Sequence, residues 1–272
     1  MYRLLRTMGI WMMVMSAPLA WASQEYANNG DFSQGNTGFT SAYKDYYTNQ
    51  ASCYSYDYRG PLMRESCYAI TNDPYSVHVG GYHRLQLGSQ GNVMVVNGAQ
   101  APVVIWMQPV QISAGHVYRW SAKAASNVTN AVNGTIGDPD PAELALQLAH
   151  SPGACTTDAA GFETIATIVT TSYGLNVVNN LFTAPNWVSA QGTTTRAQDG
   201  QYCLRIYDTN TALSGNDFLL DDLSFLDVTP TPVSSATPVA VPTLNATGLL
   251  ALSSALGWLG LRRRRKLGSG VR

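Results

Sequence analysis

The sequence predicts an all-β fold, an antiparallel β-sandwich of the jelly-roll type, over residues 23–228. Three observations support this fold class. About ten short runs are rich in apolar and β-branched residues, and several of them alternate strictly between apolar and polar side chains. Clusters of Gly, Asn, Asp, Ser and Pro separate the runs at the short spacing that is typical of sandwiches. No stretch in this range shows a convincing apolar periodicity of an amphipathic helix.

The strands follow from these runs in chain order. We expect them at residues 28–33, 67–71, 92–98, 103–112, 116–124, 143–150, 162–170, 181–189, 201–207 and 215–225. In 116–124 the alternation places Tyr118 and Trp120 on one face, so Trp120, like Trp106 in 103–112, is expected in the core. Residues 143–150 also fit a helix, but their strict alternation favours a strand. Pro109 cannot donate a backbone hydrogen bond, so it indicates an edge strand or a bulge.

The last expected strand carries two adjacent carboxylates, Asp221 and Asp222, between leucine residues. A charge within a buried strand is costly unless it is paired or bound to a cation. Asp31, in the first expected strand, is a candidate partner if the first and last strands meet. Calcium prefers six to eight oxygen ligands, so Asp31, Asp221 and Asp222 predict part of a structural Ca²⁺ site. The alternative is that Asp222 is solvated and Asp221 accepts backbone hydrogen bonds.

Nine of the fifteen tyrosines lie between residues 43 and 82, among Asn, Ser, Asp and Gly. Flat aromatic faces can stack on sugar rings while nearby polar groups fix the hydroxyls. The predicted ligand-binding residues are Tyr43, Tyr46, Tyr47, Tyr54, Tyr56 and Tyr58. The alternative is that these rings cover edges and loops of a small secreted domain.

The N-terminus predicts export. Residues 1–22 combine Arg3 and Arg6 with an apolar core and a small-residue cleavage site, so they read as a signal peptide that is cleaved after Ala22. Four cysteines suit an oxidising compartment. Three pairings are possible, and proximity along the chain favours Cys53–Cys67 and Cys155–Cys203.

The charge distribution argues against a nucleic-acid partner. Residues 23–241 contain 8 Lys/Arg and 17 Asp/Glu, a net charge of about −9. Nucleic-acid binding requires clustered Lys and Arg to neutralise phosphates.

The C-terminal part changes character. Residues 229–241 are rich in Pro, Thr and Ser, which predicts an extended linker. Residues 242–266 contain the apolar run 244–261, expected to be a transmembrane helix, and the basic cluster 262–266, which would hold that end in the cytoplasm. Residues 267–272 form a short tail.

Val241-Pro242-Thr243-Leu244, the apolar helix and the basic cluster resemble the IPTL-CTERM class of C-terminal sorting signals, which is related to the PEP-CTERM class. The class usually carries Trp-Gly shortly after the motif, whereas this chain has Thr247-Gly248. The resemblance implies an exosortase-like processing enzyme as partner and localisation to the cell envelope, or release outside the cell, in a Gram-negative bacterium.

Three further segments are similar to the galactose-binding-like, carbohydrate-binding-module jelly rolls. They are residues 29–32, residues 92–98 and residues 215–225. This resemblance implies a β-sandwich that commonly holds a structural calcium ion.

These features favour a non-catalytic, exported surface or matrix protein that binds polysaccharide. The alternative is a structural or adhesive protein with protein partners and no sugar site. A polysaccharide-active hydrolase is disfavoured, because Gly-x-Ser-x-Gly is absent and His78 and His83 lack the Glu of a metalloprotease motif. The acidic loop around Asp138 and Asp140 reads more simply as a rigid turn.

Overall fold

The computed structural model describes residues 23–88, 91–129, 140–172, 174–179, 181–212 and 216–230, together with residues 250, 251, 253, 254, 256 and 258. The chain divides into one unit that ends at Thr229 and another that begins at Pro230. The expected signal peptide, most of the expected linker and the sorting motif Val241–Leu244 lie outside the described residues. None of the helices that the structure describes is long and apolar enough to cross a membrane.

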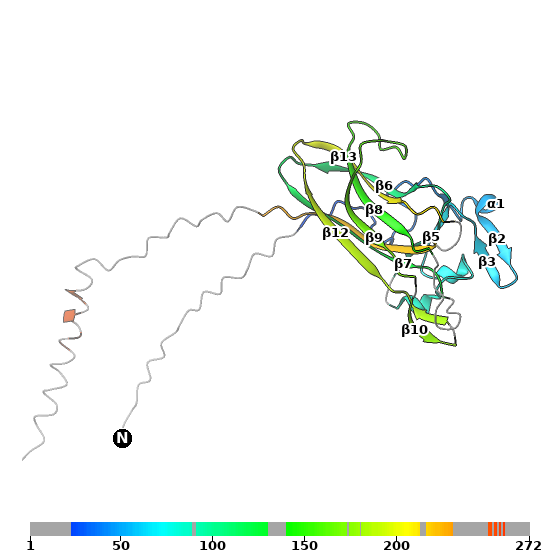
Figure 1. The fold of residues 1–272 in the computed structure, drawn as a ribbon. Coiled ribbons are helices and arrows are strands. Elements are labelled where there is room, and N and C mark those ends of the chain that lie inside the picture. Colours follow the sequence, from blue (N-terminus) through cyan, green and yellow to red (C-terminus); the bar gives the residue numbers. More distant parts are fainter. Residues whose placement is uncertain are drawn as a thin grey trace, which may run out of the picture. The chain divides into compact units, whose positions relative to one another are not determined.

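The first unit is a β-sandwich, as the alternation predicts (Figure 1). Its strands are β1 (Lys44–Asp45), β2 (Tyr54–Asp57), β3 (Gly60–Met63), β4 (Cys67–Thr71), β5 (Val93–Asn97), β6 (Val103–Ile112), β7 (Val117–Ser126), β8 (Glu143–His150), β9 (Glu163–Val169), β10 (Leu175–Val178), β11 (Leu181–Ala184), β12 (Val188–Thr195), β13 (Gly200–Asp208) and β14 (Phe218–Asp227). The helices are short: α1 (Gln50–Cys53) and the 3₁₀ turns η1 (Pro74–Ser76) and η2 (Arg84–Leu87).

Two sheets form the sandwich. One has the order β1-β4-β5-β14-β7-β12, and the other has the order β6-β13-β8-β9. From β5 onwards the chain alternates between the two sheets. The strands β5, β7, β12 and β14 lie in the six-stranded sheet, and β6, β8, β9 and β13 lie in the four-stranded sheet. This alternation is typical of a jelly roll. All pairings within these two sheets are antiparallel except β1 with β4. Pro109 lies on β6, an edge strand of its sheet, as predicted.

The core between the sheets is aromatic and fully enclosed. Trp106 on β6 and Trp120 on β7 are both 0% exposed, which confirms that they are core residues, and their ring centroids lie 5.7 Å apart. Phe225 on β14 stacks on Tyr118 of β7 at 5.1 Å. Burying such large rings is the main contribution to the stability of a sandwich of this size.

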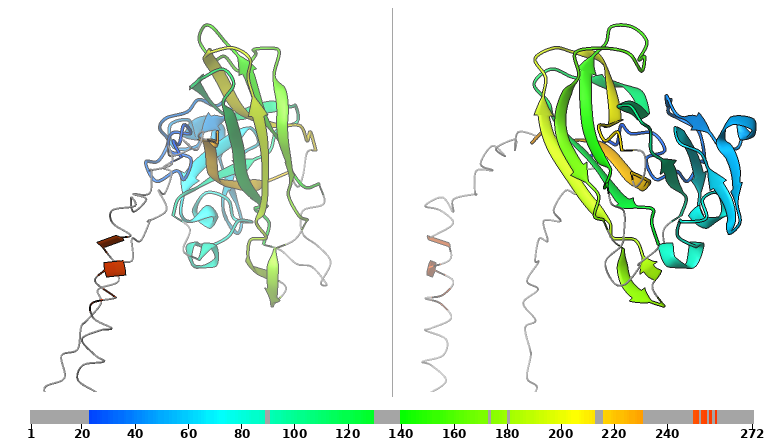
Figure 2. Two further views of the ribbon diagram at one scale, coloured as in Figure 1. Left: turned by 90° about the vertical axis from the view of Figure 1, so that its left-hand side faces the viewer. Right: turned by 45° about the vertical axis from the view of Figure 1, so that its right-hand side comes forward.

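A second apolar cluster covers the outer face of β4, β5 and β14. It joins Val93, Val95 and Leu219 of these strands to Met63 of the β2–β3 hairpin and Phe182 of β11. The sheet is therefore buried on both faces at this end. In the right-hand view of Figure 2 the β2–β3 hairpin, which forms its own two-stranded sheet, lies beside the sandwich.

Two expected strands differ from the structure. Residues 28–33 form turns rather than a strand, and Asn29 and Phe32 have positive φ angles of 53° and 51°. Positive φ is incompatible with an extended strand, so these residues reverse the chain. Residues 181–189 contain the whole of one hairpin strand, β11, and the start of another strand, β12.

The first and last segments of the domain meet, as expected. Glu25 forms a bridge with Leu226, and the Leu223 amide donates to the Gly30 carbonyl at 3.0 Å. The turn that contains Asp31 therefore lies directly against β14.

Candidate functional site

Four of the six predicted ligand-binding tyrosines are exposed and close together in the fold. The exposed fractions are 51% for Tyr47, 41% for Tyr54, 68% for Tyr56 and 91% for Tyr58. We call these four residues the tyrosine strip. Tyr54 and Tyr56 occupy alternate positions of β2, so both side chains project from one face of the hairpin. The Arg59 guanidinium lies 5.4 Å from the centroid of the Tyr58 ring, in cation–π range.

The other two predicted residues, Tyr43 and Tyr46, are wrong as ligand contacts. Both side chains are buried, with 4% and 5% exposure, because each belongs to one of the two apolar clusters. Tyr46 instead supports the strip: its ring centroid lies 5.4 Å from that of Tyr47 and 6.2 Å from that of Tyr54.

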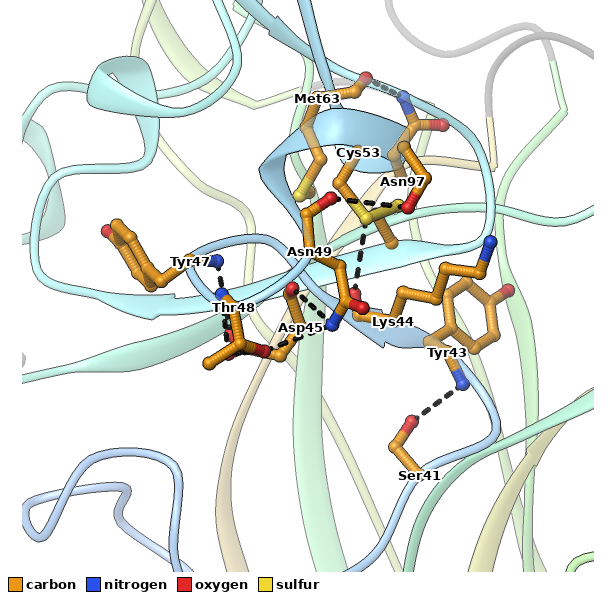
Figure 3. Close-up of a disulfide and its surroundings, with 12 residues drawn as sticks. Ser41, Tyr43, Lys44, Asp45, Tyr47, Thr48, Asn49, Cys53, Met63 and Asn97 are labelled. Carbon is orange, nitrogen blue, oxygen red and sulfur yellow. Dashed lines mark hydrogen bonds between the residues drawn. A yellow bond between two sulfur atoms is a disulfide. The ribbon is translucent and has the colours of Figure 1, made fainter.

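A disulfide fixes the base of the hairpin. Cys53–Cys67 is formed, as predicted, and links the residue before β2 to the first residue of β4 (Figure 3). The Arg64 amide donates to the Cys53 carbonyl at 2.8 Å, and Met63 is fully buried beside it. The Tyr47 ring points away from the disulfide (Figure 3). The strip is thus carried by a rigid element, which lowers the entropy that a ligand would have to remove.

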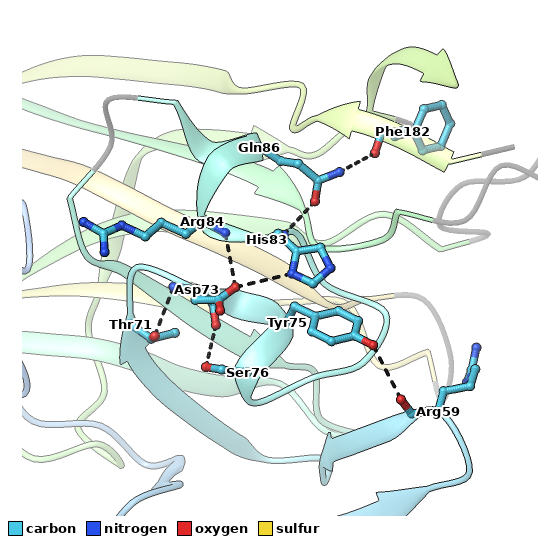
Figure 4. Close-up of polar contacts among 9 residues, drawn as sticks. All are labelled: Arg59, Thr71, Asp73, Tyr75, Ser76, His83, Arg84, Gln86 and Phe182. Atoms are coloured by element: carbon cyan, nitrogen blue, oxygen red, sulfur yellow. Dashed lines mark hydrogen bonds and ion pairs between the residues drawn. The ribbon is translucent and has the colours of Figure 1, made fainter. Parts of the chain in front are cut away.

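A polar network supports the hairpin from the side of η1 and η2 (Figure 4). Asp73 accepts the Arg84 amide at 3.1 Å and lies 3.9 Å from His83 Nδ1. The His83 ring packs against Tyr75 with centroids 4.0 Å apart and an interplanar angle of 32°, and the Tyr75 hydroxyl donates to the Arg59 carbonyl at 3.5 Å. These contacts hold the turn of the hairpin in place.

The predicted metal ligands are only partly brought together. Asp31 and Asp222 line one open surface pocket of about 430 Å³, together with Glu25. Asp222 has a φ of 51° and lies at the point where the register of β14 against β7 shifts, so its side chain leaves the sheet. Asp221 is not among the residues that line this pocket.

A lysine that the sequence analysis did not consider pairs with both adjacent aspartates. Lys123 Nζ lies 2.7 Å from Asp222 Oδ2 and 3.6 Å from Asp221 Oδ2. Asp221 faces Lys123 directly in the β7–β14 register, and its side chain is 4% exposed. Burial raises the pKa of the Asp221 carboxyl to about 6, against the opposing effects of the Asp222 amide and Lys123. Lys123 therefore supplies a positive charge beside both aspartates.

The donor set around the pocket is incomplete for calcium. Asp31 Oδ1 accepts the Ser33 amide and hydroxyl, which lowers the pKa of Asp31, and Glu25 Oε1 accepts three backbone amides. In the part of the chain that the structure describes, no group of three or more His, Cys, Asp and Glu side chains could hold a metal ion. Calcium binding stays a prediction. Of its three predicted ligands, Asp31 and Asp222 line the pocket of about 430 Å³ and Asp221 does not.

The second predicted disulfide is also confirmed. Cys155 in the loop after β8 pairs with Cys203 on β13. It covers the outer face of the four-stranded sheet, beside Arg205, whose guanidinium lies 3.5 Å from the Phe162 ring centroid. The same guanidinium lies 4.6 Å from the Tyr207 ring centroid, and its burial among these rings lowers the pKa of Arg205.

Fold and C-terminus together define the class of protein: a disulfide-bonded β-sandwich followed by a sorting segment. Residues 239–266 match the family model described as the IPTL-CTERM motif, as the sequence analysis expects. Among curated proteins, none matches the chain.

Solved structures similar to this chain include carbohydrate-binding modules. TmCBM61 in complex with β-1,4-galactotriose has 11% identity and a TM-score of 0.41, covering 75% of this chain and 99% of that one. The CBM22-1 xylan-binding domain from Paenibacillus barcinonensis Xyn10C has 15% identity and a TM-score of 0.35, covering 60% and 82%. The Stig cyclase Fisc from Fischerella sp. TAU has 11% identity and a TM-score of 0.40, covering 77% and 100%. With TM-scores below 0.5, these similarities assign neither a ligand nor a site to this chain.

Proposed function

We propose that this chain is an exported, non-catalytic protein of the cell envelope whose tyrosine strip binds polysaccharide. The observation that carries the proposal is the exposure of Tyr54, Tyr56 and Tyr58 on a hairpin whose base a disulfide fixes, with the exposed Tyr47 beside it. Large apolar side chains are not normally exposed together unless they contact something. Tyrosine suits sugar in particular, since the ring stacks on the apolar face of a pyranose while the hydroxyl remains available for hydrogen bonds.

Charge supports a neutral rather than an anionic polysaccharide. The part of the chain from residue 23 to residue 241 has a net charge of about −9. An anionic polymer would be repelled by this surface at moderate ionic strength. The IPTL-CTERM motif at residues 239–266 supports export and handling by an exosortase-like enzyme at the envelope.

A glycan array with the purified protein tests the proposal. Tyr56→Ala and Tyr58→Ala should each weaken binding to the recognised glycan by about 2- to 10-fold, the range expected for loss of one aromatic stacking contact. Leu85→Ala is the matched control, because Leu85 is 93% exposed but lies on η2, outside the strip. No binding to any neutral glycan, or equal loss in Leu85→Ala, would count against a sugar site on the strip.

A structural or adhesive role is the second candidate, and a specific surface favours it. The β10–β11 hairpin exposes Leu175, Val177, Val178 and Leu181 by 44% to 56%. Apolar side chains on both strands of an uncovered hairpin are typical of a protein-contact surface. If the protein binds no glycan on the array, and if it self-associates in a way that Val177→Asn abolishes, the structural or adhesive role would be favoured over polysaccharide binding.

A further inference from the structure

We propose that His78, Asp217 and Asn127 form a binding site for a divalent transition-metal cation of the zinc class. The site lies where β7 ends and β14 begins, away from both the tyrosine strip and the Asp31–Asp222 pocket. It does not depend on the proposed function.

The three side chains converge from separate segments. Asn127 follows β7 and Asp217 precedes β14, and the Asn127 amide donates to the Asp217 carbonyl at 2.9 Å. Their neighbours Ser126 and Phe218 are partners in the ladder, so Asn127 and Asp217 stand opposite each other on the same face of the sheet. His78 reaches this face from the turn after η1, and its Nε2 lies 3.5 Å from Asp217 Oδ2.

The separation between His78 Nε2 and Asp217 Oδ2 is longer than a hydrogen bond; it lies within ion-pair range and also fits two ligands of one metal ion. Hydrogen bonds from nitrogen to oxygen usually span about 2.7–3.2 Å. Bonds from zinc to nitrogen and oxygen are about 2.0–2.2 Å, and tetrahedral geometry then places the two ligand atoms about 3.4 Å apart. The observed distance is 3.5 Å.

Unpaired polar atoms gather at the same place. Asn127 is 1% exposed, and neither its Oδ1 nor its Nδ2 has a hydrogen-bond partner within the described residues. His78 Nδ1 is buried and equally without a partner there. Buried polar groups are normally hydrogen-bonded, so the unpaired Asn127 amide supports a bound cation beside the His78–Asp217 pair. His78 Nδ1 points away from a metal on Nε2, so its lack of a partner carries no weight for the site.

The turn at Gly80 and Gly81 is shaped to bring these groups together. A Cβ at Gly81 would lie 2.9 Å from Asn127 Oδ1 and 3.1 Å from the His78 carbonyl oxygen. Any larger residue would push the His78 turn away from Asn127. Glycine thus permits the close approach of the two segments that carry the ligands.

The donor types select the metal class. Imidazole suits zinc and its neighbours in the first transition row, whereas calcium prefers oxygen ligands alone. Asp217 Oδ1 accepts the Gly98 amide at 3.2 Å, which orients the carboxylate and leaves Oδ2 facing His78. The described residues offer no group of three His, Cys, Asp and Glu side chains at this place. We therefore take the Asn127 amide oxygen as the third ligand, because this side chain is buried and unpaired on the same face as Asp217, and water completes the shell.

Zinc titration of the metal-stripped full-length protein, followed by thermal melting and calorimetry, tests the site. We expect one Zn²⁺ per chain and a rise in melting temperature of about 5 °C when zinc is in 100-fold excess over its dissociation constant. His78→Ala should abolish this rise. His83→Ala should retain it, because His83 faces Asp73 at 3.9 Å on the exposed surface and serves as the matched control.

A second variant keeps the test decisive if His78→Ala fails to fold. Asn127→Asp retains the oxygen ligand and adds a charge, so it should bind zinc at least 10-fold more tightly than the unaltered protein. An unaltered protein that does not respond to zinc, or a loss in His83→Ala equal to that in His78→Ala, would overturn the proposal. A rise with calcium alone would also overturn it and would favour the Asp31–Asp222 pocket.

Discussion

Replacing the buried carboxyl Asp208 should remove a large part of the pH dependence of stability. Asp208 ends β13 and is 0% exposed, with the Tyr43 hydroxyl 3.5 Å from Oδ2 and the Asn210 amide donating to Oδ1 at 3.1 Å. Burial raises the pKa of Asp208 from 3.8 to about 7, with repulsion from Glu143 in the same direction. The folded protein therefore retains a proton that the unfolded chain releases near pH 4.

The sign and size of the effect on the free energy of unfolding follow from this pKa shift. The stabilising contribution of protonated Asp208 is fully present below pH 4 and is lost as the pH rises through about 7. A change of about 3 pKa units corresponds to about 4 kcal/mol of unfolding free energy. In Asp208→Asn the neutral amide resembles the protonated carboxyl at every pH, so the variant should be more stable relative to the unaltered protein at pH 8 than at pH 4.

Urea unfolding at half-unit steps from pH 4 to pH 8 measures the effect. The difference in unfolding free energy between Asp208→Asn and the unaltered protein should grow by about 4 kcal/mol across this range. Asp31→Asn is the control. Its difference in unfolding free energy from the unaltered protein should change with pH in the opposite direction, because hydrogen bonds from Ser33 lower the pKa of Asp31. Parallel stability curves for Asp208→Asn and the unaltered protein would refute the reasoning.

Three further changes test the fold. Cys67→Ser opens a loop of 14 residues and should lower the unfolding free energy by about 3 kcal/mol in denaturant melts, with looser packing of the tyrosine strip. Lys123→Met leaves Asp221 buried without its counter-charge and should cost about 3 kcal/mol at pH 8, with a smaller loss at pH 5, where Asp221 is largely protonated. Phe225→Ala removes a ring that is 0% exposed, so it should cost about 3–5 kcal/mol; a loss below 1 kcal/mol in the same melts would contradict its place in the core.

The strands that alternate could be predicted from the sequence, because burial of one face imposes a period of two. β7 and β13 are found within one or two residues of the expected ranges. The second apolar layer was missed. Its signal is Val93-Met94-Val95-Val96, where four consecutive residues are buried; such a run indicates a strand that is covered on both faces.

The site was predictable only in part, because composition does not report burial. Tyr43 and Tyr46 share the sequence context of Tyr47, yet they face the two cores. The partner of Asp221 was equally hidden, since Lys123 reaches it only through the register of β7 against β14, nearly one hundred positions along the chain. In β2, Tyr54 and Tyr56 alternate with Ser55 and Asp57, yet both tyrosines are exposed, so the pattern does not show which face is buried. Met63 of β3 anchors the hairpin on the second apolar cluster.

The position of β14 bears on how the domain would respond to tension. The chain leaves the sandwich directly from this strand, which is hydrogen-bonded to β5 on one side and to β7 on the other. Near the end of the strand, Leu226 forms a β-bridge with Glu25. A force directed along the axis of β14 would load both ladders in shear, so many hydrogen bonds would have to break together rather than one after another. An edge strand in the same place would peel away from its single neighbour.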